Sequence, residues 1–265
     1  MLEYSFMQNA LLGGVIIALV CGFVSVFVIL RRTSFAAHAL GHMSLTGAAG
    51  AALLGLPSIL GQIILNVVAS VAMGLMGDKV KKNDLAIGVV LTFVLGFGIY
   101  FLFLFQNNYA GSVMGILFGN IFAVSHAQLV QLAILGSVIL ITLLFILRPL
   151  VFVSIDPVVA ESKNIPVRLI SVIFFVVLAV TVSMACQIVG VMLVFTLLII
   201  PGAIGNQWGQ SIMQSLIISM MSAVSSVIIA LFISYSLDLP ASFCITMVLC
   251  LMYFIGGIKN KLFVK

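Results

Sequence analysis

Two histidines four residues apart are the residues best suited to chemistry in this sequence. They are His38 and His42, within the segment AHALGHM at residues 37–43. Residues at this spacing share one face of a helix, with Cβ atoms about 5–6 Å apart, so two neutral imidazoles can reach one divalent metal ion. Imidazole nitrogen suits zinc, and copper, nickel and iron also accept it. The pair therefore predicts contact with a transition metal; the alternative is that both histidines hydrogen-bond to neighbouring helices.

The same spacing occurs in metalloprotease helices, but the neighbouring residues exclude that activity. A protease site of this kind needs His-Glu-x-x-His, with the glutamate as general base. Here Ala39 follows His38, and the stretch from Arg32 to Asp78 contains no carboxylate before Asp78 itself. The sequence also has no Gly-x-x-x-x-Gly-Lys-Ser/Thr loop for binding ATP. We therefore expect no enzyme, no catalytic residue and no permanently bound cofactor; if ATP drives the protein, a partner subunit hydrolyses it.

Three other positions are weaker candidates for a functional role. His126 precedes an apolar run, where a solvated histidine is expected rather than a ligand. Gln187 lies between apolar residues and predicts a hydrogen bond between helices or a polar group lining a path. Pro201 and Gly202 interrupt the apolar segment 188–206, and proline inside a helix frees a carbonyl and kinks the chain. A gate and a kink for packing both fit these residues.

The elements that position these residues must be membrane-spanning helices. Hydrophobic residues make up 64% of the 265 residues and charged residues only 6%, against about a quarter in soluble domains. So few charges cannot cover a water-exposed surface, which excludes a soluble enzyme and a nucleic-acid-binding protein. We expect an all-α polytopic bundle of about eight to ten spans at ~20 residues each, forming a single transmembrane domain over residues 1–265.

The lysines and arginines predict the topology of this bundle. They lie in small groups between apolar runs, and short loops rich in lysine and arginine stay in the cytoplasm. The groups are Arg31 and Arg32; Lys79, Lys81 and Lys82; Arg148, Lys163 and Arg168; Lys259, Lys261 and Lys265. Alternation then predicts nine spans in the cytoplasmic membrane, with the N-terminus outside and the C-terminus in the cytoplasm. The spans are 9–30, 34–54, 58–77, 85–105, 127–147, 167–186, 188–206, 211–236 and 241–258.

Two segments between the spans have expected structures of their own. Residues 111–125 are apolar but too short to span, and glycines recur there at every fourth position, so we expect a re-entrant or interfacial helix on the outer side. On the inner side, Asp156 is a good N-cap and Pro157 a good first helical residue. A short cytoplasmic helix over residues 157–162 that packs on a partner is therefore expected, with a plain loop as the alternative.

Six segments in order make the sequence similar to the permease subunits of zinc, manganese and iron ABC importers, with zinc-uptake permeases as the nearest match. The likeness runs nearly end to end. The segments are Arg31 to His42 followed by Gly47 and LLG at 53–55; NDLAIG at 83–88; LFGNIFAVS at 117–125; the loop 155–166; VGVMLV to LLIIP at 189–201; and DLP at 238–240.

The resemblance implies partners and roles that the residues alone do not. It implies a homodimer, two cytosolic ATP-binding subunits and an extracytoplasmic metal-binding protein that delivers the ion. The loop carrying Asp156, Pro157, Glu161 and Pro166 would couple the permease to the ATPase. His38 takes the place of the family's aspartate, which moves the site towards nitrogen ligands and favours zinc over manganese.

The expected function is thus ATP-driven import of a divalent metal, with zinc favoured over manganese or iron. A secondary transporter or channel driven by an ion gradient is the main alternative. That class keeps carboxylates within its spans, whereas all six acidic residues here lie in loops or at span ends. A membrane scaffold without transport activity is a third class, against which the histidine pair and the interrupted segment 188–206 argue.

Overall fold

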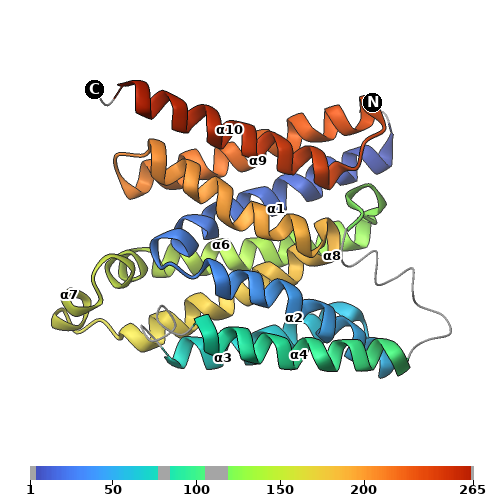
Figure 1. Cartoon of the computed structure of the whole chain (residues 1–265), viewed down its shortest axis with the longest axis horizontal. Helices are drawn as coiled ribbons and strands as arrows, with labels where there is room; N and C mark the ends of the chain where they lie inside the picture. Colours follow the sequence, from blue (N-terminus) through green and yellow to red (C-terminus); the bar gives the residue numbers. More distant parts are fainter. Residues whose placement is uncertain (1–3, 77–83, 105–118, 264–265) are drawn as a thin grey trace.

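The computed structural model describes residues 4–76, 84–104 and 119–263, which form a bundle of helices joined by short turns (Figure 1). The helices are α1 Ser5–Leu30, α2 Ser34–Leu53, α3 Ser58–Met76, α4 Asp84–Leu104, η2 Ile121–Ala123, α6 His126–Ile155, α7 Pro157–Ser162, α8 Val167–Trp208, α9 Ile212–Leu237 and α10 Ala241–Phe263. No β-strand occurs in the described ranges. The expected all-α architecture is therefore confirmed there, and most helix ends fall within a few residues of the predicted spans.

The outer surface of the bundle is apolar, as a surface in contact with lipid must be. Leu85 of α4 is 82% exposed and Phe145 of α6 is 84% exposed. Both are large apolar side chains on the outside of long apolar helices. By length and composition, six described helices could cross a membrane: α1, α3, α4, α6, α8 and α9. A chain with this surface and these helices is a multi-pass membrane protein.

The helix α8 is too long for one crossing and contains a sharp break. Its 42 residues would extend about 63 Å at 1.5 Å per residue, roughly twice the ~30 Å hydrocarbon core of a bilayer. Gly190 inside it has φ 80° and ψ 158°, a conformation that is essentially restricted to glycine. The helix therefore consists of two segments that meet at Gly190.

Contacts with α1 show that these two segments run in opposite directions. In the first segment, Ser171 Oγ accepts a hydrogen bond from Arg31 Nη2 at 2.7 Å. In the second, Gly202 packs directly against the backbone of Ser25. A straight helix would hold Ser171 and Gly202 about 46 Å apart, yet Ser171 contacts Arg31, the C-cap residue of α1, and Gly202 contacts Ser25 in the last two turns of α1. The chain thus reverses direction within α8, as Figure 1 shows, and Gly190 is the non-helical residue inside this helix.

The structure therefore places the break in α8 at Gly190, and not at Pro201 and Gly202 as the sequence predicted. The helical conformation continues through Pro201, and Gly190 is the residue of α8 with non-helical dihedral angles. A Cβ on Gly202 would collide with the carbonyl of Ser25. Glycine is needed at that position because it lets the backbones of α1 and α8 approach closely, and not because the helix ends there.

The predicted re-entrant helix over residues 111–125 lies mostly outside the described residues, which omit 105–118. In the described remainder, Gly119 has φ +67° and Asn120 is also non-helical, with φ −146° and ψ 87°. They lead into the single 3₁₀ turn η2. Of the predicted helix, the described residues 119–125 therefore contain only this short 3₁₀ turn.

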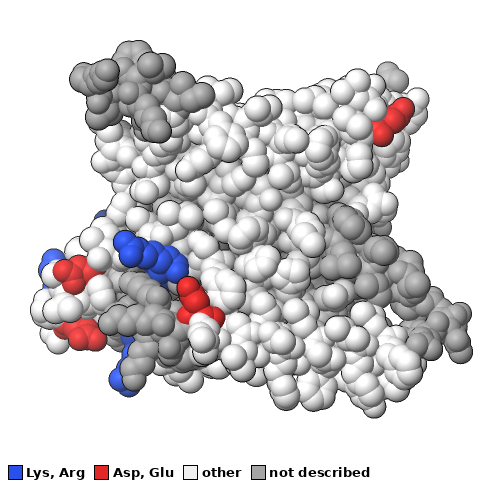
Figure 2. Space-filling view, viewed as in Figure 1, with Lys and Arg blue, Asp and Glu red and all other residues white. Residues whose placement is uncertain are grey.

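The predicted short helix after α6 is confirmed as α7. Asp156 Oδ1 accepts hydrogen bonds from the backbone N–H groups of Val158 at 2.9 Å and Val159 at 3.2 Å, and Pro157 is the first helical residue. On the face shown in Figure 2, most charged side chains gather at the end of the molecule that carries α7. The two ends of the bundle therefore differ in charge.

Candidate metal site

The two histidines lie side by side on one face of α2, as their spacing predicts. The ring centroids of His38 and His42 are 4.6 Å apart, with the ring planes at 77°. Both side chains are half-buried. In the described part of the chain neither imidazole forms a hydrogen bond, so the alternative expectation, a pair hydrogen-bonded to neighbouring helices, has no support there.

A phenylalanine from the second segment of α8 completes the surroundings of the pair. The ring centroid of Phe195 lies 4.6 Å from that of His38, with the planes at 64°. No pattern in the sequence connects Phe195 with the histidines, because 157 positions separate it from His38. Only the reversal at Gly190 brings this segment of α8 against α2.

The position of α2 is fixed by close contacts with its neighbours. Gly47 packs against the backbone of Gly61, so α2 and α3 touch without intervening side chains. On the α4 side, Thr46 Oγ1 donates a hydrogen bond to the carbonyl of Val94 at 3.0 Å.

A buried amide also ties α2 to two helices behind the histidine face. Asn66 on α3 donates from Nδ2 to Ser44 Oγ at 2.6 Å and to Ser183 Oγ at 2.9 Å. Ser44 belongs to α2 and lies two residues after His42; Ser183 belongs to the first segment of α8. One side chain thus bridges three helices, although no motif in the sequence singles it out.

The histidine pair faces outward from the single chain. Phe35 (37% exposed) lies on the same stripe of α2, while Met192 (55%) and Phe195 (37%) flank it on α8. Among the described residues, no group of three or more histidine, cysteine, aspartate or glutamate side chains could hold a metal. One chain therefore offers two imidazole ligands on an open apolar face.

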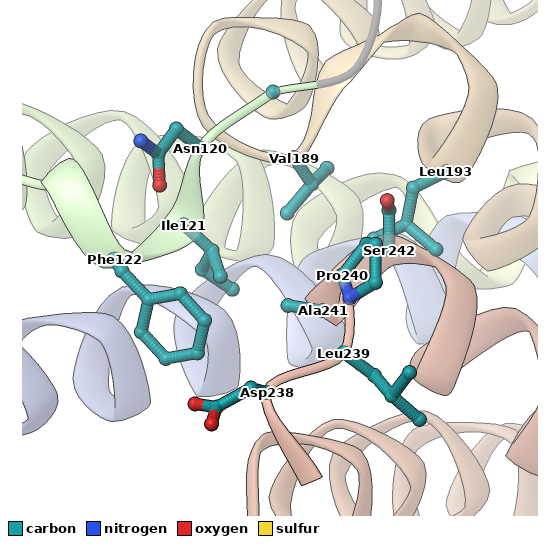
Figure 3. A pocket seen from close by; sticks show the side chains of 11 residues that line it. Asn120, Ile121, Phe122, Val189, Leu193, Asp238, Leu239, Pro240, Ala241 and Ser242 are labelled. Atoms are coloured by element: carbon teal, nitrogen blue, oxygen red, sulfur yellow. The ribbon is translucent and has the colours of Figure 1, made fainter. Parts of the chain in front are cut away.

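A separate pocket of about 480 Å³ lies where α8 reverses. Figure 3 shows Val189 and Leu193 of α8 near the residues Pro240 to Ser242, with Asp238 beneath Phe122. Its lining comprises Gly119, Asn120, Ile121, Phe122, Val189, Leu193, Asp238, Leu239, Pro240, Ala241 and Ser242. The histidines do not line this pocket, which is mainly apolar with one exposed carboxylate.

The other predicted site residues lie apart from the histidine pair. His126 is the exposed first residue of α6, as expected for a solvated side chain. Gln187 is half-buried in α8, three residues before Gly190. The proposed coupling residues Asp156 and Glu161 belong to the turn into α7 and to α7 itself.

Comparison with known proteins decides the family. A model of the ABC 3 transport family matches residues 3–260. The chain belongs to this family. Among curated relatives of this ABC 3 permease, the manganese import system permease protein ScaB of Streptococcus parasanguinis is 30% identical over 255 residues, covering 96% of this chain and 90% of the relative. A probable iron transport system membrane protein of Haemophilus influenzae is 27% identical over 265 residues, covering 100% of this chain and 97% of the relative.

Solved structures agree with the fold. The ABC 3 permease superposes on a chain of PsaBC from Streptococcus pneumoniae, determined in complex with Fab, with a TM-score of 0.85 and 28% identity, covering 96% of this chain and 91% of that one. An inward-facing putative metal-chelate type ABC transporter matches with a TM-score of 0.74 at 15% identity, over 95% of this chain and 85% of that one; at this identity only the fold is shared. The resemblance to metal ABC permeases found in the sequence is thus confirmed.

Proposed function

We propose that this chain is the permease subunit of an ATP-driven importer of divalent transition-metal ions. The observation that carries the proposal is the pair of adjacent imidazoles of His38 and His42 on an open face of an ABC 3 permease. Relatives named as manganese and iron transport proteins support a metal as the cargo.

In this proposal the chain crosses the cytoplasmic membrane nine times. The two segments of α8, which meet at Gly190, count as two spans, and α2 and α10 join the six long apolar helices. The end that carries α7 lies in the cytoplasm, since short loops rich in lysine and arginine stay there. The N-terminus is then outside and the C-terminus inside.

A second copy of the chain covers the histidine face. An apolar surface that includes Met192 and Phe195 beside two polar imidazoles is poorly suited to lipid, because hydrocarbon cannot solvate the imidazoles. A two-fold axis beside this face places the same surface of each copy against the other. Such a dimer brings up to four imidazoles together, which equals the number of ligands that zinc takes in proteins.

The ligand chemistry favours zinc, whereas the names of the relatives point to manganese or iron. His38 stands where the family resembled in sequence has aspartate, so both protein ligands of one chain are nitrogen. Carboxylate oxygen suits manganese, and imidazole suits zinc. We therefore propose zinc as the preferred cargo of this permease. The ion passes the pair weakly bound and is not a permanent cofactor.

The two ends of the molecule take different partners. At the cytoplasmic end, α7 exposes Val158 (74%) and Val159 (43%), two apolar side chains suited to packing on an ATPase subunit. The Asp156 cap and the turn through Glu161 to Pro166 hold α7 in place for this contact. At the opposite end, an extracytoplasmic metal-binding protein delivers the ion.

A gradient-driven transporter is the second candidate, and the placement of carboxylates disfavours it. Of the acidic residues in the described ranges, Asp84 begins α4, Asp238 ends α9, and Asp156 and Glu161 belong to α7 or its cap. None lies in the middle of a span, where a proton- or sodium-coupling group is needed. Co-purification of an ATPase with this chain separates the two candidates.

The decisive experiment measures zinc and manganese uptake by proteoliposomes that contain the complete transporter, comparing wild type with His38→Asp. Zinc uptake in the wild type that shifts towards manganese in the variant supports a site whose ligands set selectivity. Equal uptake of both ions by both proteins would place selection in the delivery protein. ATP-independent uptake would overturn the ATP-driven mechanism itself.

A further inference from the structure

A groove between α6 and α9 is not used by the proposed transport path. It has a volume of about 280 Å³ and lies at the end of the bundle that carries α7. Its lining comprises Leu147, Arg148, Val151, Phe152, Ile212, Met213 and Leu216. All of these side chains but one are apolar, so the groove suits a hydrocarbon chain.

The exception, Arg148, is an exposed guanidinium that has no partner among the described residues. It forms neither a hydrogen bond nor an ion pair there. Lysine and arginine at the ends of spans extend towards the lipid headgroups. A cation beside an apolar groove at this depth therefore faces the region where phosphate groups of lipids lie.

A second cation lies beside the same groove. The Nζ atom of Lys163 is 4.7 Å from the ring centroid of Phe152, and Phe152 lines the groove. The two cations come from different elements, α6 and the turn after α7: Arg148 lines the groove, and Lys163 lies against Phe152 of its lining. No acidic side chain lines the groove, which leaves the positive charge beside it uncompensated there.

The first turn of α9 adds to this charge. Ile212 and Met213 of the lining are the first two residues of this 26-residue helix. The N–H groups at a helix start carry partial positive charge and favour anions. One N–H group of this first turn is already paired, since the Ser211 hydroxyl accepts a hydrogen bond from the backbone N–H of Gln214 at 3.3 Å.

We propose that this groove binds one anionic phospholipid, with an acyl chain between α6 and α9 and its phosphate beside Arg148 and Lys163. Basic pockets between spans on the cytoplasmic side are a known way of recognising anionic headgroups. A soluble anion would leave the apolar lining uncovered, and a zwitterionic lipid would leave the two cations without net compensation. The proposal concerns lipid binding and does not depend on which ion is transported.

The test is lipid binding to the purified full-length chain, measured by native mass spectrometry. Phosphatidylglycerol and phosphatidylcholine with identical acyl chains are added separately to delipidated protein. We expect the affinity for the first bound molecule of phosphatidylglycerol to be at least about fivefold higher than that for phosphatidylcholine. One basic residue near a membrane contributes about that factor. Arg148→Gln is expected to remove most of this preference.

Two further variants make the result specific to the groove. Arg168→Gln removes an exposed cation of α8 that does not line the groove, and it should keep the preference for phosphatidylglycerol. Met213→Trp places a larger side chain at the rim of the groove and should weaken binding of both lipids. A wild type without preference, or equal loss in the Arg148 and Arg168 variants, would overturn the proposal, as would unchanged lipid binding in Met213→Trp.

Discussion

At the scale of single residues, His42 is the side chain on which the proposed transport path depends most. It lies against His38 on the half-buried face of α2, and its ring is one of two imidazoles that one chain offers. We expect His42→Ala to lower zinc uptake about tenfold or more, because even residues that only support a metal ligand cost 10–100-fold when removed. Uptake is measured at matched amounts of protein in the membrane.

His126→Ala is the matched control for that experiment, since His126 is exposed at the start of α6 and belongs to no pair. It should transport zinc as the wild type does. Normal uptake by His42→Ala would remove the pair from the mechanism. Equal losses in both variants would point to a general effect of removing histidine.

The amides of α3 provide a second prediction, about stability. Asn66 donates to hydroxyls on α2 and α8, whereas Gln62, one turn earlier, is fully buried with no hydrogen-bond partner for either side-chain atom among the described residues. Asn66→Leu should lower the free energy of unfolding by about 0.6–1.7 kcal/mol, the range for hydrogen bonds between membrane helices. Gln62→Met should be neutral or stabilising, because an unpaired buried amide costs free energy.

Unfolding of the purified variants in mixed micelles by SDS measures both effects. A destabilised Gln62→Met protein would contradict the prediction and would show that this amide has a polar partner in the membrane. An unchanged Asn66→Leu protein would show that the bridge between three helices contributes nothing to stability.

At the scale of elements, the reversal of α8 is the feature that assembles the site. Gly190 has φ 80°, and a side chain there is strained by about 1–3 kcal/mol. We expect Gly190→Ala to lower thermal stability and to reduce metal uptake, because Phe195 and the rest of the second segment lose their position against α2. Fluorescence-detected size-exclusion chromatography after heating measures the first effect.

Gly96→Ala is the control, because Gly96 lies within the helix α4 and no atom is within 4 Å of the position that an alanine Cβ would occupy. Alanine is favoured over glycine in a helix by about 1 kcal/mol, so this variant should be as stable as the wild type or more so. Equal stability of the Gly190 and Gly96 variants would show that the reversal does not need glycine.

At the scale of the whole molecule, the open histidine face predicts how two copies meet. Met192 is 55% exposed on α8 beside this face. In a two-fold dimer, a residue that lies close to the axis also lies close to the same residue of the partner, and the proposed axis runs beside this face. We expect Met192→Cys to form a cross-linked dimer with a short bismaleimide in membranes.

Val138→Cys is the comparison, since Val138 is 56% exposed on α6 and lies on a surface assigned to lipid. It should remain a monomer under the same conditions, as judged by gel electrophoresis. Cross-linking at Val138 but not at Met192 would place the interface elsewhere and leave the four-imidazole site without support.

The class of protein and most of its helices follow from the order of the residues alone. Apolar runs of about 20 residues between small groups of cations have few structural solutions, because lipid requires every backbone polar group to be paired within helices. Local signals were also sufficient for α7, where Asp156 and Pro157 cap the helix, and for the adjacency of His38 and His42. Each of these features depends on neighbours in the sequence.

The place where α8 reverses, and the side chains that face the histidines, depend on how the helices pack. Pro201 was the stronger sequence signal for a break, yet its lost hydrogen bond is tolerated within a packed helix, whereas Gly190 adopts a backbone conformation that other residues avoid. The contact of Phe195 with His38 and the bridge from Asn66 to two helices join distant segments. Spacing along the chain cannot predict such contacts, because they arise only when whole helices pack against one another.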